Sequence, residues 1–191
     1  LIIDKYVSRE VDRISPEAPM PILNKRKEEF SAGGALNLAC NLASLGCEVS
    51  GYFPLGRGES KLINNLIPDN INIDIFFKEL DEYSLPLKTR YTDSNYHQLL
   101  RVDNETHLKI DWCSYKLVEE LICKANIIVI SDYCKGAINS KMIEKLKNSG
   151  KNLFVDTKRS NIDVFSEVYL LKPNLKESIS IINSHTSKNE I

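Results

Sequence analysis

Short apolar runs alternate with helical patterns along this chain, and no other feature of the sequence constrains the fold as strongly. Strands that alternate with helices are typical of βαβ units around a mostly parallel sheet. The predicted buried strands are residues 1–3, 49–53, 127–131, 153–156 and 168–171, and the predicted helices are residues 34–45, 59–66, 115–125, 140–149 and 175–182. We therefore expect an α/β fold, a three-layer α/β/α sandwich with helices on both faces of the sheet.

The composition suits one globular domain and argues against several partner classes. The chain has 191 residues, of which 42% are hydrophobic and 27% charged, enough for a sizeable core. A net charge of −1 gives no electrostatic basis for binding nucleic acid or an anionic membrane, and no apolar run could span a bilayer. The five cysteines form no C-x-x-C pair, which indicates free thiols and a cytoplasmic protein. The three histidines are too scattered to form a zinc site.

Two segments interrupt the alternation and predict a small β-sheet flap. Residues 11–27 contain three prolines among apolar residues, and residues 87–102 alternate like half-exposed strands. Paired extended segments inserted into an α/β chain suit a sheet that covers one face of the domain. We place the two parts of this lid at about residues 9–30 and 87–103.

Two adjacent glycines, Gly33 and Gly34, open an amphipathic helical pattern in residues 32–46. Glycine lets the backbone approach a ligand closely and present its N–H groups to it. Asn37 falls in the first turn with an amide that can donate to and accept from sugar hydroxyls, and Gly46 predicts the end of the helix. The apolar stripe comprises Ala35, Leu38, Ala39 and Leu42. A well-packed helix after a tight turn explains this segment equally well when it is taken alone.

Charged or amide side chains follow four of the predicted strands. Asp4, Asp132, Asp156 and Lys172 each come directly after an apolar run, and Lys172 is followed by Pro173 and Asn174. In a doubly wound sheet, ligands bind outside the carboxyl ends of the strands. Each residue alone is commonly a helix cap or a loop residue, but the four together favour a polar site at that edge.

The chain resembles the ribokinase-like carbohydrate kinases, and the order of several motifs carries the resemblance. These motifs are residues 1–6 (LIIDKY), 13–22 (RISPEAPMPI), 32–46 (AGGALNLACNLASLG), 131–136 (SDYCKG), 155–158 (VDTK) and 172–177 (KPNLKE). The run RISPEAPMPI before a Gly-Gly-x-x-Asn helix, followed by SDYCKG, is most similar to the heptose-7-phosphate kinase branch. The resemblance implies a ribokinase-like fold with a β lid over the sugar. It also implies ATP- and Mg²⁺-dependent phosphorylation of the anomeric hydroxyl of D-glycero-β-D-manno-heptose 7-phosphate to the 1,7-bisphosphate, in ADP-heptose and lipopolysaccharide biosynthesis.

The resemblance also implies roles for particular residues. The predicted sugar-binding residues are Asp4, Gly33, Gly34, Asn37 and Asp132, the predicted phosphate-binding residues are Arg101 and Lys158, and the predicted ATP- and magnesium-ordering residues are Asn174 and Glu177. A carboxylate such as that of Asp4 can accept two hydrogen bonds from neighbouring sugar hydroxyls. Glu177 would act on the metal only indirectly.

Each of these roles has a simpler alternative. Asp4 could be a loop carboxylate, Lys158 part of a solvated basic loop with Arg159, and Arg101 one member of a surface cross-strand pair. The spacing of Asn174 and Glu177 is also that of a helix capping box, with Asn174 as the N-cap of the last helix.

The sequence departs from the family in two ways. No Gly-Ala-Gly-Asp loop, the family's source of the catalytic base and anion hole, occurs in residues 1–191. No acidic residue directly follows Gly56. The P-loop-like segment 51–58 is a separate, false signal, because it has Arg57 and Gly58 where a P-loop requires lysine and Ser/Thr. The chain starts inside an apolar run without an initiator methionine and ends after a polar stretch, so both ends are expected to be cut.

We therefore predict that residues 1–191 are the N-terminal, sugar-binding portion of one kinase domain. Two alternatives stay open: a kinase for another sugar, and a non-catalytic module or pseudokinase that binds a sugar phosphate. A phosphorylated sugar and ATP are the expected partners, with neither nucleic acid nor membrane, and a homodimer is left open.

Overall fold

The computed structural model describes residues 1–107 and 115–189, which divide into two compact units, Leu1–Thr106 and His107–Ile191. The first unit contains β1 (Ile2–Ile14), β2 (Pro21–Gly33), α1 (Gly34–Ser44), β3 (Val49–Gly56), α2 (Ser60–Asn64), β4 (Ile73–Leu80), β5 (Leu87–Thr92) and β6 (Gln98–Asn104). The second contains α3 (Lys116–Lys124), β7 (Ile127–Asp132), α4 (Ser140–Lys147), β8 (Asn152–Thr157), the short 3₁₀ helix η2 (Asp163–Phe165), β9 (Leu170–Leu171) and α5 (Leu175–Asn189). The predicted α/β class is confirmed.

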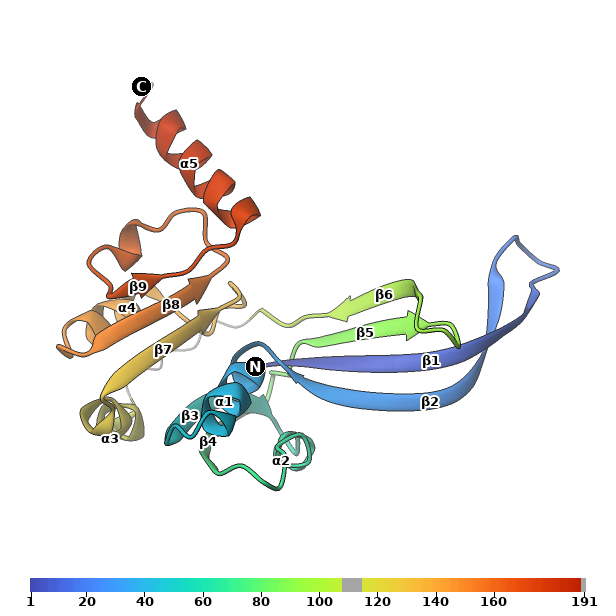
Figure 1. Ribbon diagram of the computed structural model, residues 1–191, viewed down its shortest axis with the longest axis horizontal. Helices are drawn as coiled ribbons and strands as arrows, with labels where there is room; N and C mark the ends of the chain where they lie inside the picture. Colours follow the sequence, from blue (N-terminus) through green and yellow to red (C-terminus); the bar gives the residue numbers. More distant parts are fainter. Residues whose placement is uncertain (108–114, 190–191) are drawn as a thin grey trace. The chain divides into compact units, whose positions relative to one another are not determined.

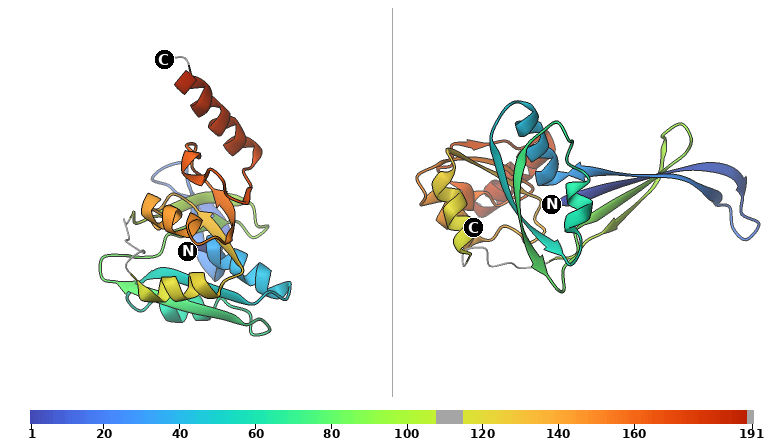
Figure 2. Two further views of the ribbon diagram at one scale, coloured as in Figure 1. Left: turned by 90° about the vertical axis from the view of Figure 1, so that its left-hand side faces the viewer. Right: turned by 90° about the horizontal axis from the view of Figure 1, so that it is seen from below.

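A long hairpin dominates the first unit. β1 and β2 pair antiparallel, β5 runs parallel to β1, and β6 pairs antiparallel with β5, in the order β2-β1-β5-β6 (Figure 1). The hairpin extends away from α1 and from the β3–β4 pair (Figure 2). Both segments predicted to form the flap lie in this sheet. Its role as a lid over a sugar stays a prediction.

The first strand is much longer than the apolar run that predicted it. The expected strand ended at residue 3, whereas β1 continues to Ile14. Ile3 and Val7 are buried while Asp4 and Tyr6 point to the other face, so the strand persists through the polar residues by alternation. Two of the prolines, Pro16 and Pro19, lie in the turn between β1 and β2. The missing N–H of proline removes no hydrogen bond between the strands there. Asp4 therefore lies within a strand and does not follow one.

Helix α1 packs against β1, β2, β3 and β4. Leu36, which lies outside the predicted apolar stripe, is fully buried, and Ala39 is 6% exposed. The helix ends at Ser44, and the predicted stop residue Gly46 follows two residues later with a φ of +89°, a left-handed conformation that favours glycine. The N–H of Cys47 donates to the carbonyl of Leu42 and that of Gly46 to Ala43, the two bonds of a Schellman motif.

Strand β3 pairs in parallel with β4, which the sequence did not predict. The segment that forms β4, IDIFFKEL, mixes Asp74 and Lys78 with apolar residues and is only half-buried along its length. Its pattern lacks the continuous apolar run that marks a fully buried parallel strand.

The second unit is built on three parallel strands in the order β7-β8-β9. The sequence predicted these strands and their parallel pairing, but not their order. Its core comprises Ile130, Met142, Ile143, Leu146, Leu153, Val155 and Phe165. The last helix, α5, leads away from the sheet (Figure 1). Among the described residues no helix is both long enough and apolar enough to cross a membrane.

Candidate functional site

The carboxylate of Asp4 lies against the backbone at Gly33, where β2 ends and α1 begins. In the ladder of β1 with β2, Asp4 pairs with Ser31 and Ile2 with Gly33, so Asp4 and Gly33 share one face. A Cβ at position 33 would lie 2.6 Å from Asp4 Oδ2 and 3.1 Å from the carbonyl oxygen of Ile2. The φ angle of Gly33 is −122°, a value that any residue can adopt. Glycine is therefore required here only because Asp4 and Ile2 leave no space for a Cβ.

The first turn of α1 presents backbone N–H groups beside this carboxylate. Gly33 is the N-cap and has no side chain to accept from these groups, and Gly34 has a left-handed φ of +54°. The side chain of Asn37 is exposed in this turn. Uncapped N–H groups at a helix N-terminus favour oxygen-rich or anionic ligands. The structure thus brings Asp4, Gly33 and Gly34 together, with Asn37 one turn along the helix.

Arg90 on β5 forms an ion pair with Asp4, and the sequence analysis did not anticipate it. Arg90 Nη1 donates to Asp4 Oδ1, and the guanidinium lies over the ring of Tyr6, 5.3 Å from its centroid. The hydrogen bond to Asp4 is the main reason that the pKa of Arg90 is raised. One oxygen of Asp4 is therefore bound by arginine while the other faces Gly33.

The predicted phosphate ligand Arg101 lies directly opposite Arg90 in the β5–β6 ladder. Its Nε is 2.9 Å from Oδ1 of Asp103, and its side chain is 49% exposed. Like charges in directly opposed positions repel each other unless each is neutralised. Asp4 and Asp103 each neutralise one of these arginines.

A hollow of about 540 Å³ lies on the same face of the sheet, beyond the ion pair. Tyr6 lines it together with four other hydroxyl-bearing residues, Ser8, Thr92, Ser94 and Tyr96, and with the ion pair of Lys27 and Glu29. Because Tyr6 also carries the Arg90 guanidinium on its ring, the hollow adjoins the ion pair. The hollow and the Asp4–Arg90 ion pair thus share Tyr6, and neither Asp4 nor Arg90 lines the hollow itself.

In the second unit, Asp132 is buried and braces the loop that follows β7. Its side chain is 2% exposed. Oδ1 accepts from the Cys134 N–H at 2.9 Å, and Oδ2 accepts from Arg159 Nε and from the Thr157 hydroxyl at 3.3 Å. Arg159 Nη2 in turn donates to the carbonyl of Ile138 at 2.6 Å. This geometry favours a structural task for Asp132, whose role as a substrate ligand stays a prediction.

Asn174 and Glu177 form the capping arrangement that their spacing predicts. The Glu177 N–H donates to Asn174 Oδ1 at 2.9 Å, and the Asn174 N–H donates to Glu177 Oε2 at 2.8 Å. Lys158 Nζ forms an ion pair with Glu177 and lies 5.5 Å from the centroid of the Tyr133 ring. Lys158 thus binds the capping carboxylate of α5 here. The predicted roles of these residues toward phosphate, ATP and magnesium stay predictions.

Acid should loosen the start of α5. The hydrogen bond from Lys158, followed by that from the Asn174 N–H, lowers the pKa of Glu177 below its ordinary value of 4.5. A carboxyl with a lowered folded pKa stabilises the fold fully above 4.5, and this stabilisation disappears as the pH falls through the folded value. In an NMR titration we expect the Asn174 amide shift to follow a midpoint below 4.5, and to become flat in Glu177→Gln. A wild-type midpoint at or above 4.5 would contradict the ion pair.

Glu59 ties the end of β3 to the segment before β5. Its carboxylate accepts from the N–H of Gly56 at 2.7 Å and from that of Leu85 at 3.0 Å. A Cβ on Gly56 would lie 2.3 Å from the carbonyl oxygen of Tyr83, so this glycine also serves close approach. Burial, with the charge of Glu59, raises the pKa of Tyr83 to about 12. The family's acidic residue directly after Gly56 is missing, but Glu59 supplies a carboxylate three residues after it.

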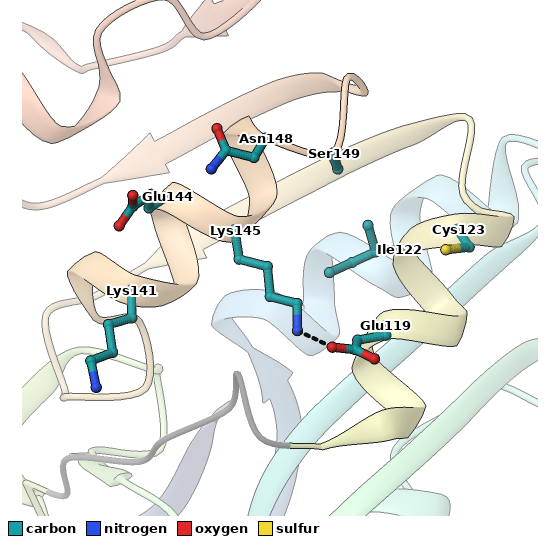
Figure 3. A pocket seen from close by; sticks show the side chains of 8 residues that line it. All are labelled: Glu119, Ile122, Cys123, Lys141, Glu144, Lys145, Asn148 and Ser149. Atoms are coloured by element: carbon teal, nitrogen blue, oxygen red, sulfur yellow. Dashed lines mark hydrogen bonds and ion pairs between the residues drawn. The ribbon is translucent and has the colours of Figure 1, made fainter.

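A second hollow, of about 620 Å³, opens between α3 and α4 in the second unit (Figure 3). Glu119 and Lys145 face each other across it at 2.6 Å, and Ile122 and Cys123 line the α3 side. None of the predicted site residues lines it. Within the described residues, no group of three or more His, Cys, Asp or Glu side chains could hold a metal ion.

The comparisons with known proteins agree with this architecture. Residues 2–190 match the pfkB family of carbohydrate kinases. The chain is 32% identical to the bifunctional protein HldE of Pseudomonas aeruginosa (strain LESB58) and 30% identical to that of Haemophilus influenzae (strain PittEE). Each alignment covers 100% of this chain and 41% of the relative. The chain therefore spans less than half the length of these curated relatives.

Solved structures show the same fold. Phosphofructokinase-2 from Escherichia coli, solved with substrates and products, gives a TM-score of 0.72 at 20% identity over 95% of this chain and 60% of that one. Arabidopsis thaliana ribokinase with ribose and ATP gives 0.68 at 16% identity over 97% of this chain and 66% of that one. These neighbours confirm the ribokinase-like α/β fold. By its sequence match and its fold, the chain belongs to the pfkB family of carbohydrate kinases.

Proposed function

We propose that the protein containing this chain is an ATP-dependent kinase for D-glycero-β-D-manno-heptose 7-phosphate, which it converts to the 1,7-bisphosphate on the route to ADP-heptose. The order of the motifs and the similarity to the HldE proteins support the branch. The observation that carries the sugar-binding part is the close approach of Asp4 to Gly33 at the start of α1. This places a hydroxyl acceptor next to uncapped backbone donors, which is the chemistry that a polyol needs.

In this proposal the first unit binds the sugar. Asp4 accepts hydrogen bonds from the sugar hydroxyls. The Asn37 side chain and the backbone N–H groups after Gly33 form further hydrogen bonds to the sugar. Arg101, half-exposed on the same sheet, addresses the phosphate that the sugar already carries. The β1–β2 hairpin with β5 and β6 serves as the lid, and residues 1–191 form the sugar-binding portion of one kinase domain.

The ATP side of the proposal rests on the second unit. Asn174 and Glu177 offer amide and carboxylate oxygens, the ligand type that Mg²⁺ prefers, directly or through water. Bound MgATP supplies the phosphoryl group. Lys158 forms an ion pair with Glu177. This ion pair must break before the Glu177 carboxylate can help to bind a cation. The lysine would then be free to reach a phosphate oxygen.

The test is the activity of the gene product that contains residues 1–191. We expect it to phosphorylate heptose 7-phosphate in the presence of MgATP, and to act far less well on hexose 6-phosphates and ribose. Phosphorylation of another sugar with no activity on heptose 7-phosphate would assign the chain to a different sugar. No turnover on any sugar, with binding retained, would favour a non-catalytic sugar-phosphate-binding module.

Residues 1–191 contain no Gly-Ala-Gly-Asp loop, so the 191-residue chain tested by itself separates sugar binding from phosphoryl transfer. Phosphoryl transfer depends on positioning and on stabilisation of charge, so a chain without the base and its anion hole should lack nearly all catalysis. We expect the 191-residue chain by itself to bind the sugar phosphate weakly in calorimetry and to show no ATP turnover. Turnover by this chain would show that the loop is dispensable.

A further inference from the structure

The two oxygens of Asp4 have different surroundings. Oδ1 accepts from Arg90 Nη1, whereas Oδ2 lies 2.6 Å from the position that a Cβ on Gly33 would take, at the start of α1. A carboxylate that grips two vicinal hydroxyls alone would turn both oxygens toward the ligand. In this arrangement Oδ2 is the oxygen that can accept a hydrogen bond from a sugar hydroxyl, because Oδ1 already accepts one from the guanidinium of Arg90.

Arg90 is held where it can act on the same ligand. β5 runs parallel to β1, and the register pairs Arg90 with Tyr6, so the arginine lies on the face that carries Asp4. Its side chain is only 23% exposed and rests over the Tyr6 ring. The contact with Asp4 uses Nη1, whereas a guanidinium carries five N–H donors in a rigid plane.

We propose that Arg90 is a second sugar-contacting residue and that Asp4 and Arg90 together read two neighbouring hydroxyls. One hydroxyl donates to Asp4 Oδ2, and the next accepts from an N–H of Arg90. The inference rests on the proposed function, because it concerns the same sugar site. It replaces the two-oxygen grip by Asp4 alone with one acceptor and one donor, fixed to each other by the ion pair.

The charge of the pair fits this task. Asp4 and Arg90 neutralise each other, so a neutral polyol can cover both without leaving a buried charge unpaired. Tyr6, whose ring carries the guanidinium, also lines the adjoining hollow, together with hydroxyl-bearing residues and the Lys27–Glu29 ion pair. Arg101 pairs with a different carboxylate, that of Asp103.

The test is calorimetric binding of heptose 7-phosphate and of two analogues, each lacking one of the paired hydroxyls, to the 191-residue chain. Loss of a hydrogen bond to a charged group weakens binding by about 10- to 100-fold. We expect Arg90→Gln to bind the parent sugar about 10- to 100-fold more weakly than wild type. Arg90→Lys retains the positive charge but loses the planar set of N–H donors of the guanidinium. We expect its affinity to lie between those of wild type and Arg90→Gln. Arg57→Gln is the matched control, because Arg57 Nε also binds an aspartate, Asp81 Oδ1, at 2.6 Å, on an exposed part of the same unit.

The analogues separate contact from a merely structural role. Wild type should lose affinity for both analogues, while Arg90→Gln should lose nothing further when the hydroxyl that faces Arg90 is removed. Thermal melting of each variant identifies the temperature at which all are folded, and binding is compared below it.

Three outcomes would contradict the proposal. If Arg90→Gln binds heptose 7-phosphate as tightly as wild type does, Arg90 does not contact the sugar. If Arg90→Gln binds both analogues more weakly than the parent sugar, and by the same factor, Arg90 has only a structural role. If wild type binds no hexose or heptose phosphate at all, the proposed function fails, and the inference about Arg90 fails with it.

Discussion

Replacing Gly33 with alanine is expected to weaken sugar-phosphate binding by about 10- to 100-fold, because the displaced Asp4 carboxylate loses its hydrogen bond to the sugar. The new Cβ would lie 2.6 Å from Asp4 Oδ2, closer than any ordinary Cβ contact. The carboxylate must therefore swing away, which breaks its ion pair with Arg90. Overpacking of this kind should also lower the free energy of unfolding by about 1–3 kcal/mol. Calorimetry and thermal melting of the variant measure the two effects.

A double-mutant cycle shows whether the carboxylate is the group that is displaced. In an Asp4→Ala background, Gly33→Ala should destabilise the chain much less, because the clash with Oδ2 is gone. An equal loss of stability in both backgrounds would mean that the new Cβ acts through the carbonyl oxygen of Ile2, 3.1 Å away, and would contradict the apposition of Asp4 and Gly33.

Removing the Asp132 carboxylate should have the largest effect on stability. Asp132→Ala leaves Arg159 without its partner and frees the Cys134 N–H that shapes the loop after β7. Breaking a buried ion pair from one side costs about 3–5 kcal/mol. Hydrogen exchange of the amides in β7 and β8 reports on the second unit directly, and we expect their protection to fall accordingly.

Two variants place that result in context. Glu119→Gln removes the exposed ion pair with Lys145 in the same unit and should change protection little. Asp132→Asn retains an acceptor for the Cys134 N–H but not the charge, and should fall between wild type and Asp132→Ala. If Asp132→Ala leaves protection unchanged and removes sugar-phosphate binding, Asp132 is a substrate ligand, as the sequence alone suggested.

The features that the sequence predicted well depend on neighbouring residues. Three features follow from local spacing: the glycine stop of α1, the apolar strand segments of the second unit, and the capping of α5 by Asn174. Such signals act over a few residues, so periodicity and turn chemistry suffice to find them. The class of fold follows from the same signals.

The features that the sequence missed depend on distant residues. Arg90 meets Asp4 across 86 positions, and Glu59 meets Leu85 across 26. No spacing rule connects such pairs, because the register of β1 with β5 and the path of the loop before β5 decide which side chains meet. The length of β1 was missed for a related reason: cross-strand pairing with β2 and β5 holds residues that show no apolar run of their own.

The ladder of β1 and β2 also sets where the chain can change in length during evolution. Its register is regular from the Ile2–Gly33 pair to the Ser8–Lys27 pair and shifts only farther out, between Ser8 and Arg9 and between Val11 and Arg13. A deletion of one residue between Gly33 and Lys27 would reverse the inward and outward positions and turn Asp4 away from Gly33. Beyond the first shift, gains and losses of residues leave that alignment intact. Homologous chains should therefore differ in length at the far end of this hairpin and keep a constant spacing at its base.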